Sequence, residues 1–356
     1  MKKLKVAFCG GGTGGHYYPA VAILHALSRV REIELLYFTV WGKIDDRSVE
    51  RDFPGVRKMS LKLTGLKRPL YSPANASIFF SHLRTERSVK RQLAEFSPDF
   101  LFSTGGYVSY PVVRAAKTLE IPIYIHEQNS IVGIANKRLA KYARRFFISF
   151  EESGRDLELP KERIVYSGNP VRESKITRNE VMKRFDLPDN KPLIVVLGGS
   201  LGSELINRAC EGLYEEIQSN DCELSFLHST GDESSAISLR RFPFVRAFSY
   251  IEDLTDAIAC ADLVVSRGGA TTIAELQYFG RKGIIIPWSG AAENHQFYNA
   301  RSLERVGLGY VILEGNLTST ALRIAINEML HRKISYKPPR RPVEIVLDNI
   351  LREESI

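Results

Sequence analysis

FCGGGTGGHYYPA, residues 8–20, places five glycines between an apolar run at residues 4–8 and a helix-like segment at residues 20–27. After a buried strand, consecutive glycines let the backbone approach a ligand at the positive end of the following helix. We predict that this helix begins near Pro19 or Ala20, because proline is tolerated in a first turn. His16 adds a group that exchanges a proton near neutral pH, or else simply caps the helix.

The same strand-then-helix pattern continues along the chain. Apolar runs without polar alternation occur at residues 5–8, 34–38, 100–102, 123–125, 145–148, 164–166, 193–197, 223–227, 263–265, 283–286 and 309–312. Helix-like segments separate most of these runs, as at residues 20–31, 86–95 and 271–279. Such runs predict parallel strands that are buried on both faces of the sheets of an α/β fold.

A second glycine loop, VVLGGSLGS at residues 195–203, restarts the pattern halfway along the chain. We therefore predict two doubly wound parallel-sheet domains with a hinge near residue 168. The first domain comprises residues 1–167 together with 343–356, and the second comprises residues 168–342. The tail at residues 343–351 is predicted to be a short helix that packs back on the first domain.

Length and composition set broad limits on the protein class. A chain of 356 residues favours two domains over one core. No apolar run approaches the roughly 18 residues of a membrane span, and the start of the chain does not resemble a signal peptide. The four cysteines show no paired spacing, which indicates neither a zinc site nor a disulfide framework. The net charge of +8 is compatible with phosphorylated, lipid or nucleic-acid partners and does not choose among them.

Gly10, Gly12 and Gly15 match the GxGxxG pattern of nicotinamide-binding loops. That pattern also requires an acidic residue about 20 positions later, at the end of the second strand. The predicted second strand ends instead in Phe38-Thr39-Val40-Trp41-Gly42. We therefore disfavour a nicotinamide-linked oxidoreductase.

Two further loops follow predicted strands of the first half, GGYVSYP at residues 105–111 and HEQN at residues 126–129. Strand-end loops of an open parallel sheet gather on one edge, so we expect Thr13, His16, Tyr107 and Asn129 to be neighbours. His126 and Glu127 have two interpretations of equal weight, a loop-fixing pair or a catalytic pair.

The second half contains SRGGATTIAELQYFGRKGIIIP at residues 266–287 and AAENHQFYNA at residues 291–300. Residues 270–272 are predicted to open a helix, where backbone amides form a natural anion site. Glu275 lies further along that helix and suits two vicinal ribose hydroxyls; the alternative is an acid that only complements the helix dipole. Asn294, His295, Gln296 and Asn299 offer hydrogen bonds to sugar hydroxyls, or form a polar helix start.

Seven motifs in this order and spacing, GGGTGGHYYPA, GGYVSYP, HEQN, GNPVR, GGSLGS, SRGGATTIAEL and ENHQFYNA, resemble the MurG family of bacterial peptidoglycan glycosyltransferases (glycosyltransferase family 28). The resemblance covers residues 5–301. It implies a GT-B fold, in which two Rossmann-like domains face each other across a cleft. It also implies an inverting transfer of GlcNAc from UDP-GlcNAc to the C4 hydroxyl of MurNAc in undecaprenyl-pyrophosphoryl-MurNAc-pentapeptide (lipid I), which yields lipid II. The second domain would bind mainly the donor, and the first would bind the acceptor.

The resemblance also implies roles for matching residues. His16 would be the general base, and the acceptor side would comprise Gly12, His16 and Tyr107. Ser200 would lie by the diphosphate, Ile251 would meet uracil through its backbone, and Glu275 would hold the ribose. The full donor set would be Thr13, Gly14, Gly15, Asn129, Arg172, Ser200, Ile251, Ala270, Thr271, Thr272, Glu275, His295 and Gln296. Leu201 and His295 stand where family members often have glutamine. The first difference bears on side-chain contact at the diphosphate loop, and the second bears on the contacts that distinguish sugar epimers.

We expect no metal or other cofactor, because no Asp-x-Asp pair follows a predicted strand. Helix termini, loop amides and Arg172 would instead stabilise the leaving diphosphate. We expect no nucleic-acid partner. Cell-wall synthesis and division proteins are candidate protein partners.

Residues 64–96 mix apolar side chains with cations, which is typical of a surface that enters an anionic bilayer without crossing it. The alternative is that the apolar side chains pack in the core and the charges are solvated. With a lipid acceptor, we favour a peripheral protein on the cytoplasmic face of the bacterial inner membrane. Reversing the charges of Lys67, Arg68 and Arg84 should then weaken binding to anionic vesicles.

Two other functions remain open at this stage. One is a related transferase that acts on a different lipid, such as diacylglycerol. The other is a sensor that binds UDP-GlcNAc without releasing UDP when the acceptor is supplied.

Overall fold

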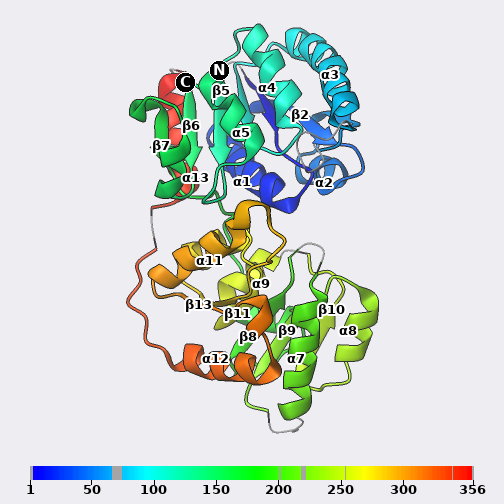
Figure 1. The fold of residues 1–356 in the computed structure, drawn as a ribbon, viewed down its shortest axis with the longest axis vertical. Coiled ribbons are helices and arrows are strands. Elements are labelled where there is room, and N and C mark those ends of the chain that lie inside the picture. The colour runs from blue at the N-terminus through cyan, green and yellow to red at the C-terminus, as the bar shows by residue number, and fades with distance from the viewer. Residues whose placement is uncertain are drawn as a thin grey trace. The chain divides into compact units, whose positions relative to one another are not determined.

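A computed structural model describes residues 3–65, 74–199, 202–217, 222–252, 254–338 and 340–354. The chain divides into two compact units (Figure 1). The first unit is Met1–Arg172 with Arg340–Ile356, and the second is Glu173–Pro339.

The unit borders lie a few residues from the predicted positions at 167 and 343. The His126 ring donates to the carbonyl of Gly168 over 3.0 Å, which ties that glycine to the first unit. Pro342 is buried, and its Cγ lies 3.1 Å from the position that a Cβ on Gly168 would occupy. Residues 168–172 and 340–342 therefore belong to the first unit because their contacts lie there.

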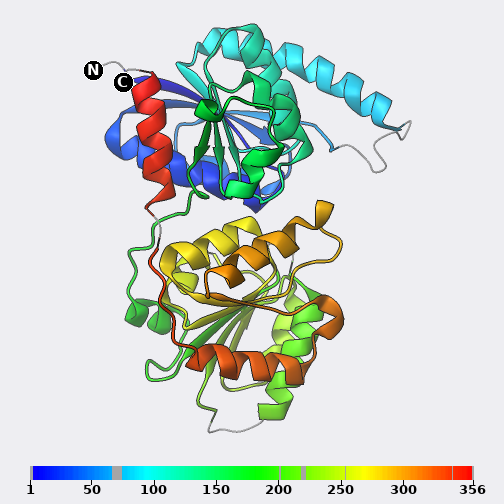
Figure 2. The ribbon, with the colours of Figure 1, turned by 60° about the vertical axis from the view of Figure 1, so that its left-hand side comes forward.

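The first unit is a parallel sheet of strand order β3-β2-β1-β4-β5-β6-β7 with helices on both faces (Figure 2). Its strands are β1 Leu4–Cys9, β2 Ile33–Val40, β3 Arg57–Leu61, β4 Phe100–Ser103, β5 Ile123–Glu127, β6 Arg145–Ile148 and β7 Ile164–Tyr166. Its helices are α1 Gly14–Val30, α2 Ile44–Asp52, α3 Ala74–Phe96, α4 Ser109–Thr118, α5 Ile134–Leu139 and α13 Pro342–Glu353.

The second unit repeats the design, with strand order β10-β9-β8-β11-β12-β13. Its strands are β8 Leu193–Leu197, β9 Ser225–Ser229, β10 Val245–Phe248, β11 Leu263–Ser266, β12 Lys282–Ile285 and β13 Gly309–Val311. Its helices are α6 Arg178–Arg184, α7 Glu204–Ile217, α8 Glu233–Leu239, α9 Leu254–Cys260, α10 Ala270–Phe279, α11 His295–Arg305 and α12 Ser319–His331. Two doubly wound sheets are confirmed.

Strand β1 illustrates why its sequence is apolar at every position. Val6 and Phe8 pack in the core beneath α1, whereas Ala7 and Cys9 pack in the core on the other face of the sheet. Successive side chains of a strand point to opposite faces, so a sheet covered on both faces needs apolar residues throughout.

Strands β3 and β10 were not predicted from the sequence, and β9 begins two residues later than predicted. Both missed strands are edge strands of their sheets. An edge strand is only partly covered, and β3 accordingly keeps most of its five residues at least partly exposed. In β3 only Met59 and Leu61 are apolar, and Arg246 interrupts β10, so both strands lack the unbroken apolar run by which the others are recognised.

The predicted C-terminal helix is confirmed as α13, which packs beside α1 in the first unit (Figures 1 and 2). Val346, Leu347 and Ile350 are buried in the same core as the inner face of α1. Glu354 anchors the end of the helix, because its carboxylate accepts from Arg144 over 2.7 Å.

Candidate active site

Helix α1 begins at Gly14, so His16 lies in its first turn. Helical bonding starts at the carbonyl of Thr13, which accepts from the amide of Tyr17 over 3.2 Å. The predicted start near residues 19–20 is therefore wrong. Glycine disfavours helix intrinsically, but the tertiary setting overrides that preference here. The result is that His16 is held by a helix and not by a loop.

The imidazole of His16 is half-buried and bonded through one nitrogen. Its Nδ1 lies 2.9 Å from the carbonyl oxygen of Thr104 and 3.0 Å from Oε1 of Gln128. A backbone carbonyl only accepts hydrogen bonds, so these contacts require the ring proton on Nδ1. The lone pair of the neutral ring is therefore on Nε2, which is the atom that can accept a proton.

A chain of hydrogen bonds supports this orientation. Nε2 of Gln128 donates to the carbonyl of His126 over 3.1 Å, which leaves Oε1 to face His16. The same Nε2 lies 3.0 Å from Nδ1 of His126, whose own Nε2 donates to Gly168. Burial lowers the pKa of His126 to about 4, so its ring is neutral at pH 7.

Glu127 holds the backbone of the loop that contains Gln128. Its Oε1 accepts from the amide and the side chain of Asn129, at 3.0 and 3.1 Å. Its Oε2 accepts from the Gly133 amide and from Nδ2 of Asn136, at 3.0 and 2.9 Å. These bonds agree with the loop-fixing interpretation of Glu127. They also show that Asn129 is held by the loop itself.

The loop after β4 approaches the first glycine turn closely. Gly105 and Gly106 have φ of 93° and 82°, which favour glycine. A Cβ on Gly106 would lie 2.7 Å from the carbonyl oxygen of Gly11, and Tyr107 packs over Gly12. His16 thus lies beside Gln128, and Tyr107 lies beside Gly12, at the edge where these strands end. That Thr13 and Asn129 join this neighbourhood stays a prediction.

Asp45, in the first turn of α2, was missed by the sequence reasoning. The residue is fully buried, and its carboxylate accepts from the amide of Gly12 over 2.9 Å and from that of Val40 over 2.6 Å. Burial raises the pKa of Asp45, although the amide bonds oppose that rise. The amide of Gly12 is thus bonded within the protein and is not open to a ligand. The available signal was an acidic residue at the start of the helix that follows β2.

In the second unit, α10 begins at Ala270 directly after Gly269, and no side chain caps its start. Gly268 is required by close packing, because a Cβ there would lie 2.3 Å from the carbonyl oxygen of Gln296. The hydroxyl oxygen of Thr271 is buried and has no hydrogen-bond partner among the described residues. A buried hydroxyl without a partner, at an uncapped helix start, is suited to donate a hydrogen bond to an oxyanion. Thr272 follows in the same turn.

Glu275 and Ile251, predicted to bind the nucleoside, are both buried in the second unit. Oε1 of Glu275 accepts from the hydroxyl of Thr255 over 2.6 Å, which links α10 to α9. Ile251 lies between the end of β10 and α9. The two residues thus lie on segments that converge on α9.

The segment before α11 carries the predicted sugar-binding residues. The side-chain oxygen of Gln296 accepts from the Trp288 amide over 3.0 Å, so its NH2 group points elsewhere. His295 is bonded through Nδ1 to the carbonyl of Ala292 over 2.7 Å. Asn299 is fully buried, and its NH2 group donates to Gly268 over 3.1 Å. Asn299 therefore supports the loop and does not offer that group to a sugar.

The glycine loop after β8 is pressed against its neighbours. A Cβ on Gly198 would lie 2.2 Å from the amide nitrogen of Ser203. Gly202 has a φ of 74°, and a Cβ there would lie 2.1 Å from the carbonyl oxygen of Thr230. Ser200 and Leu201, between these glycines, lie outside the described residues.

The predicted donor residues are divided between the two units. The second unit contains Ile251, Ala270, Thr271, Thr272, Glu275, His295 and Gln296, and the first contains Thr13, Gly14, Gly15, Asn129 and Arg172. Burial lowers the pKa of His25, and the charge of Arg172 acts in the same direction. Arg172 therefore lies near α1.

Within the basic segment 64–96, residues 66–73 lie outside the described part of the chain, including Lys67 and Arg68. Among the described side chains of α3, the apolar residues Ile78, Val89, Leu93 and Phe96 are buried. Phe80 is 64% exposed, and four cations are exposed along the same helix: Arg84, Arg87, Lys90 and Arg91. Val89, Leu93 and Phe96 pack in the core of the first unit. Among the described residues, every helix is too short or too polar to span a bilayer.

Family models match both halves of the chain. Residues 6–148 match the glycosyltransferase family 28 N-terminal domain, and residues 193–344 match the glycosyltransferase family 28 C-terminal domain.

Curated relatives match nearly the whole chain. A protein of Thermotoga neapolitana is 41% identical over 98% of this chain and 99% of the relative. One of Caldicellulosiruptor saccharolyticus is 34% identical over 94% of this chain and 91% of the relative. Both are named UDP-N-acetylglucosamine–N-acetylmuramyl-(pentapeptide) pyrophosphoryl-undecaprenol N-acetylglucosamine transferase.

Solved structures show the same fold. MurG of Acinetobacter baumannii has a TM-score of 0.72 at 22% identity, covering 99% of this chain and 100% of that chain. A putative UDP-N-acetylglucosamine 2-epimerase of Listeria monocytogenes has a TM-score of 0.71 at 13% identity, covering 99% and 97%. The chain therefore belongs to glycosyltransferase family 28 and is a glycosyltransferase of the GT-B fold, as its two Rossmann-like parallel sheets, the two matching family models and the relatives that match nearly its whole length show.

Proposed function

We propose that this enzyme transfers GlcNAc from UDP-GlcNAc to the C4 hydroxyl of MurNAc in lipid I, with inversion from an α-linked donor to a β-1,4 product. The named activity of relatives that match 98% of the chain supports this substrate pair. The observation in the structure that carries the mechanism is the tautomer of His16, whose Nδ1 is held by two oxygens.

In the proposed reaction the acceptor hydroxyl oxygen attacks C1 of GlcNAc. The bond between C1 and the β-phosphate oxygen breaks, UDP leaves, and the hydroxyl proton passes to Nε2 of His16. The resulting imidazolium keeps its Nδ1 proton directed at the oxygens of Thr104 and Gln128. Both acceptors stabilise the positive charge without a carboxylate partner.

The donor is proposed to bind mainly in the second unit. The start of α10, with the unpartnered hydroxyl of Thr271, would receive the α-phosphate. Glu275 would release Thr255 or share its carboxylate in order to bind the ribose hydroxyls. The NH2 group of Gln296 and Nε2 of His295 would face the GlcNAc hydroxyls. This binding scheme requires no metal ion.

The acceptor is proposed to bind in the first unit, beside Thr13, His16 and Tyr107. Because the carboxylate of Asp45 occupies the amide of Gly12, the acceptor pyrophosphate would contact the start of α1 and not the preceding turn. This refines the predicted acceptor role of Gly12.

The test is UDP release from UDP-GlcNAc or UDP-GalNAc, with and without lipid-linked MurNAc-pentapeptide. We expect fast release only from UDP-GlcNAc with that acceptor. Thr271→Val should raise the KM for UDP-GlcNAc about tenfold, because a hydrogen bond to a charged phosphate is lost. Equal release with diacylglycerol as acceptor would contradict the proposed substrate. UDP-GlcNAc binding without any release would indicate a sensor.

We also propose that α3 contacts an anionic membrane surface. The exposed Phe80 and the cations Arg84, Arg87 and Lys90 support this proposal. Each cation near such a surface contributes about 1 kcal/mol, so reversing these three to glutamate should weaken binding to phosphatidylglycerol vesicles at least about 100-fold at low salt.

The matched control for vesicle binding reverses three exposed arginines of the second unit, Arg208, Arg301 and Arg323. It changes the net charge equally and should leave vesicle binding within about threefold if α3 is the contact surface. Equal losses in both triple variants would mean that only overall charge matters, and unchanged binding of the α3 variant would contradict the proposal.

A further inference from the structure

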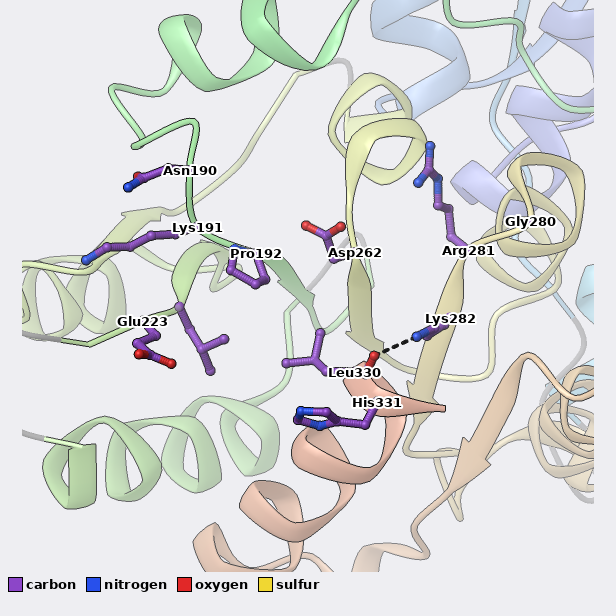
Figure 3. A pocket seen from close by; sticks show the side chains of 11 residues that line it. Asn190, Lys191, Pro192, Glu223, Asp262, Gly280, Arg281, Lys282, Leu330 and His331 are labelled. Atoms are coloured by element: carbon purple, nitrogen blue, oxygen red, sulfur yellow. Dashed lines mark hydrogen bonds between the residues drawn. The ribbon is translucent and has the colours of Figure 1, made fainter. Parts of the chain in front are cut away.

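Two neighbouring hollows open at the amino ends of the strands of the second unit. The larger, about 730 Å³, is lined by Lys191, Pro192, Glu223, Asp262, Lys282 and His331, among others (Figure 3). The smaller, about 440 Å³, is lined by Ser174, Ile176, Arg178, Cys260 and Phe279. Asp262 and Arg281 line both. We call the two together the underside pocket. The glycine loops follow the carboxyl ends of the same strands, so the pocket is on the other edge of the sheet.

The underside pocket is positively charged. Its cations are Arg178, Lys191, Arg281 and Lys282, and its carboxylates are Glu223 and Asp262. Asp262 is already engaged: it accepts from the amide of Leu193 over 2.7 Å and pairs with Arg178 over 2.9 Å. Burial lowers the pKa of Lys282, whose ammonium group donates to the carbonyl of Leu330 over 2.9 Å. The remaining positive charge would be offset by a bound anion.

Nε of Arg281 and the hydroxyl oxygen of Ser174 are buried polar atoms without a hydrogen-bond partner among the described residues. Both residues line the smaller hollow. Arg281 lies on the opposite side of Asp262 from Lys191 (Figure 3). Buried donors are normally satisfied, and here both belong to residues that line one hollow. An oxyanion accepts from an N–H and an O–H donor at once.

The lining of the smaller hollow also includes a thiol and apolar side chains. Burial raises the pKa of the Cys260 thiol, and the charges of Arg281 and Arg178 oppose that rise. Both guanidinium groups therefore lie within electrostatic range of the same thiol. Ile176 and Phe279 contribute apolar surface to the lining of the smaller hollow. This combination suits a phosphate group that is attached to a small apolar or aromatic body.

We propose that the underside pocket binds a small phosphorylated ligand through Arg281 and Ser174, at a site separate from the proposed donor site. This proposal does not rest on the identity of the glycosyl donor or acceptor. Ser174 lies just after the border at which the chain enters the second unit, so a bound ligand would also hold that entering segment.

The test is titration calorimetry with inorganic phosphate, in low salt and in the presence of saturating UDP so that the proposed donor site is filled. We expect phosphate to bind to the underside pocket, and the pocket variants separate this binding from any at the proposed acceptor site at the start of α1. Arg281→Gln should weaken phosphate binding at least about tenfold, because a charge-assisted hydrogen bond is lost. Ser174→Ala should weaken it about threefold, as expected for one neutral hydrogen bond. The matched control is Arg208→Gln, an exposed arginine on α7 of the same unit, which should bind phosphate as the wild type does.

Arg281→Lys separates geometry from charge, because it keeps the cation but loses Nε. We expect it to weaken phosphate binding less than Arg281→Gln does. Thermal melts followed by circular dichroism check that each variant is folded. The proposal is overturned if the wild type binds no phosphate, or if Arg281→Gln binds it as tightly as the wild type. If UDP does not bind to the wild type, the proposed donor site is contradicted. The comparison of phosphate affinity between the wild type and the pocket variants is unaffected by that result.

Discussion

Replacing His16 by alanine should lower kcat for UDP release about 10²–10⁴-fold, which is the usual contribution of a general base. The affinity for UDP should stay within about threefold, because the proposed donor contacts are made by other residues. The physical reason is that Nε2 carries the only lone pair of the ring while Nδ1 is bonded to Thr104 and Gln128. Rates from a coupled UDP assay and UDP titration give the two quantities.

Two companion variants make this result specific. His25→Gln changes another histidine of α1 and should leave kcat within about threefold, since we propose no role for His25 in catalysis. Gln128→Leu removes one of the two oxygens that stabilise the His16 imidazolium, so kcat should fall about tenfold with UDP affinity unchanged. A His16→Ala enzyme that keeps more than half of its kcat would refute the assignment of the base.

Acidification from pH 7 to pH 5 should destabilise both units through their buried histidines. Burial lowers the pKa of His126 to about 4 and that of His228 to about 3, from an ordinary value of 6.5. Below pH 6.5 these two histidines bind protons in the unfolded chain but stay neutral in the folded chain. The free energy of unfolding therefore falls as the pH falls. Each histidine contributes about 1.4 kcal/mol per pH unit, or about 2 kcal/mol by pH 5. Such a loss is a large part of a stability of about 5–15 kcal/mol.

His228 offers the sharper test, because it can be replaced by an uncharged side chain that does not titrate. The ring lies 3.1 Å from the Tyr214 hydroxyl and 3.0 Å from Oδ1 of Asn207, whose NH2 group donates to Thr230. His228→Gln keeps a donor and an acceptor but does not titrate. Its unfolding free energy should therefore depend less on pH, by about 1.4 kcal/mol per unit between pH 6.5 and 5.

Urea unfolding at several pH values measures how the free energy of unfolding depends on pH. Tryptophan fluorescence follows one unit at a time when only that unit contains a tryptophan. The chain has two tryptophans, Trp41 in the first unit and Trp288 in the second, so Trp41→Phe leaves a reporter of the second unit. In that background His331→Gln, an exposed histidine of α12, should keep the wild-type slope. Equal slopes for His228→Gln and its parent would show that His228 does not titrate on unfolding.

Much of the fold was predictable because the central strands are buried on both faces. Residues 4–9 and 193–197 are apolar at almost every position, and the structure places both at the centres of their sheets. Strands β3 and β10 were not predictable in this way, because β3 has only two apolar residues and Arg246 interrupts β10. The start of α1 was also missed, because glycine propensity indicated a loop.

The candidate site was predictable where glycine marks a close approach of two backbones, as at Gly106 and Gly268. It was not predictable where a contact joins residues that are distant in sequence. Asp45 reaches Gly12 across 33 positions, and Gln128 reaches His16 across 112. No local pattern encodes which side chain meets which amide.

The sequence by itself determined that two parallel-sheet units follow one another, each with a glycine loop behind its first central strand. Short-range periodicity and turn chemistry are sufficient for that, because they act within a few residues. The tertiary structure alone decided which nitrogen of His16 holds the proton, that the amide of Gly12 is already occupied, and that Asn299 supports a loop. These features depend on donors and acceptors brought together by folding, and each donor is satisfied by whichever acceptor the packed chain places in reach.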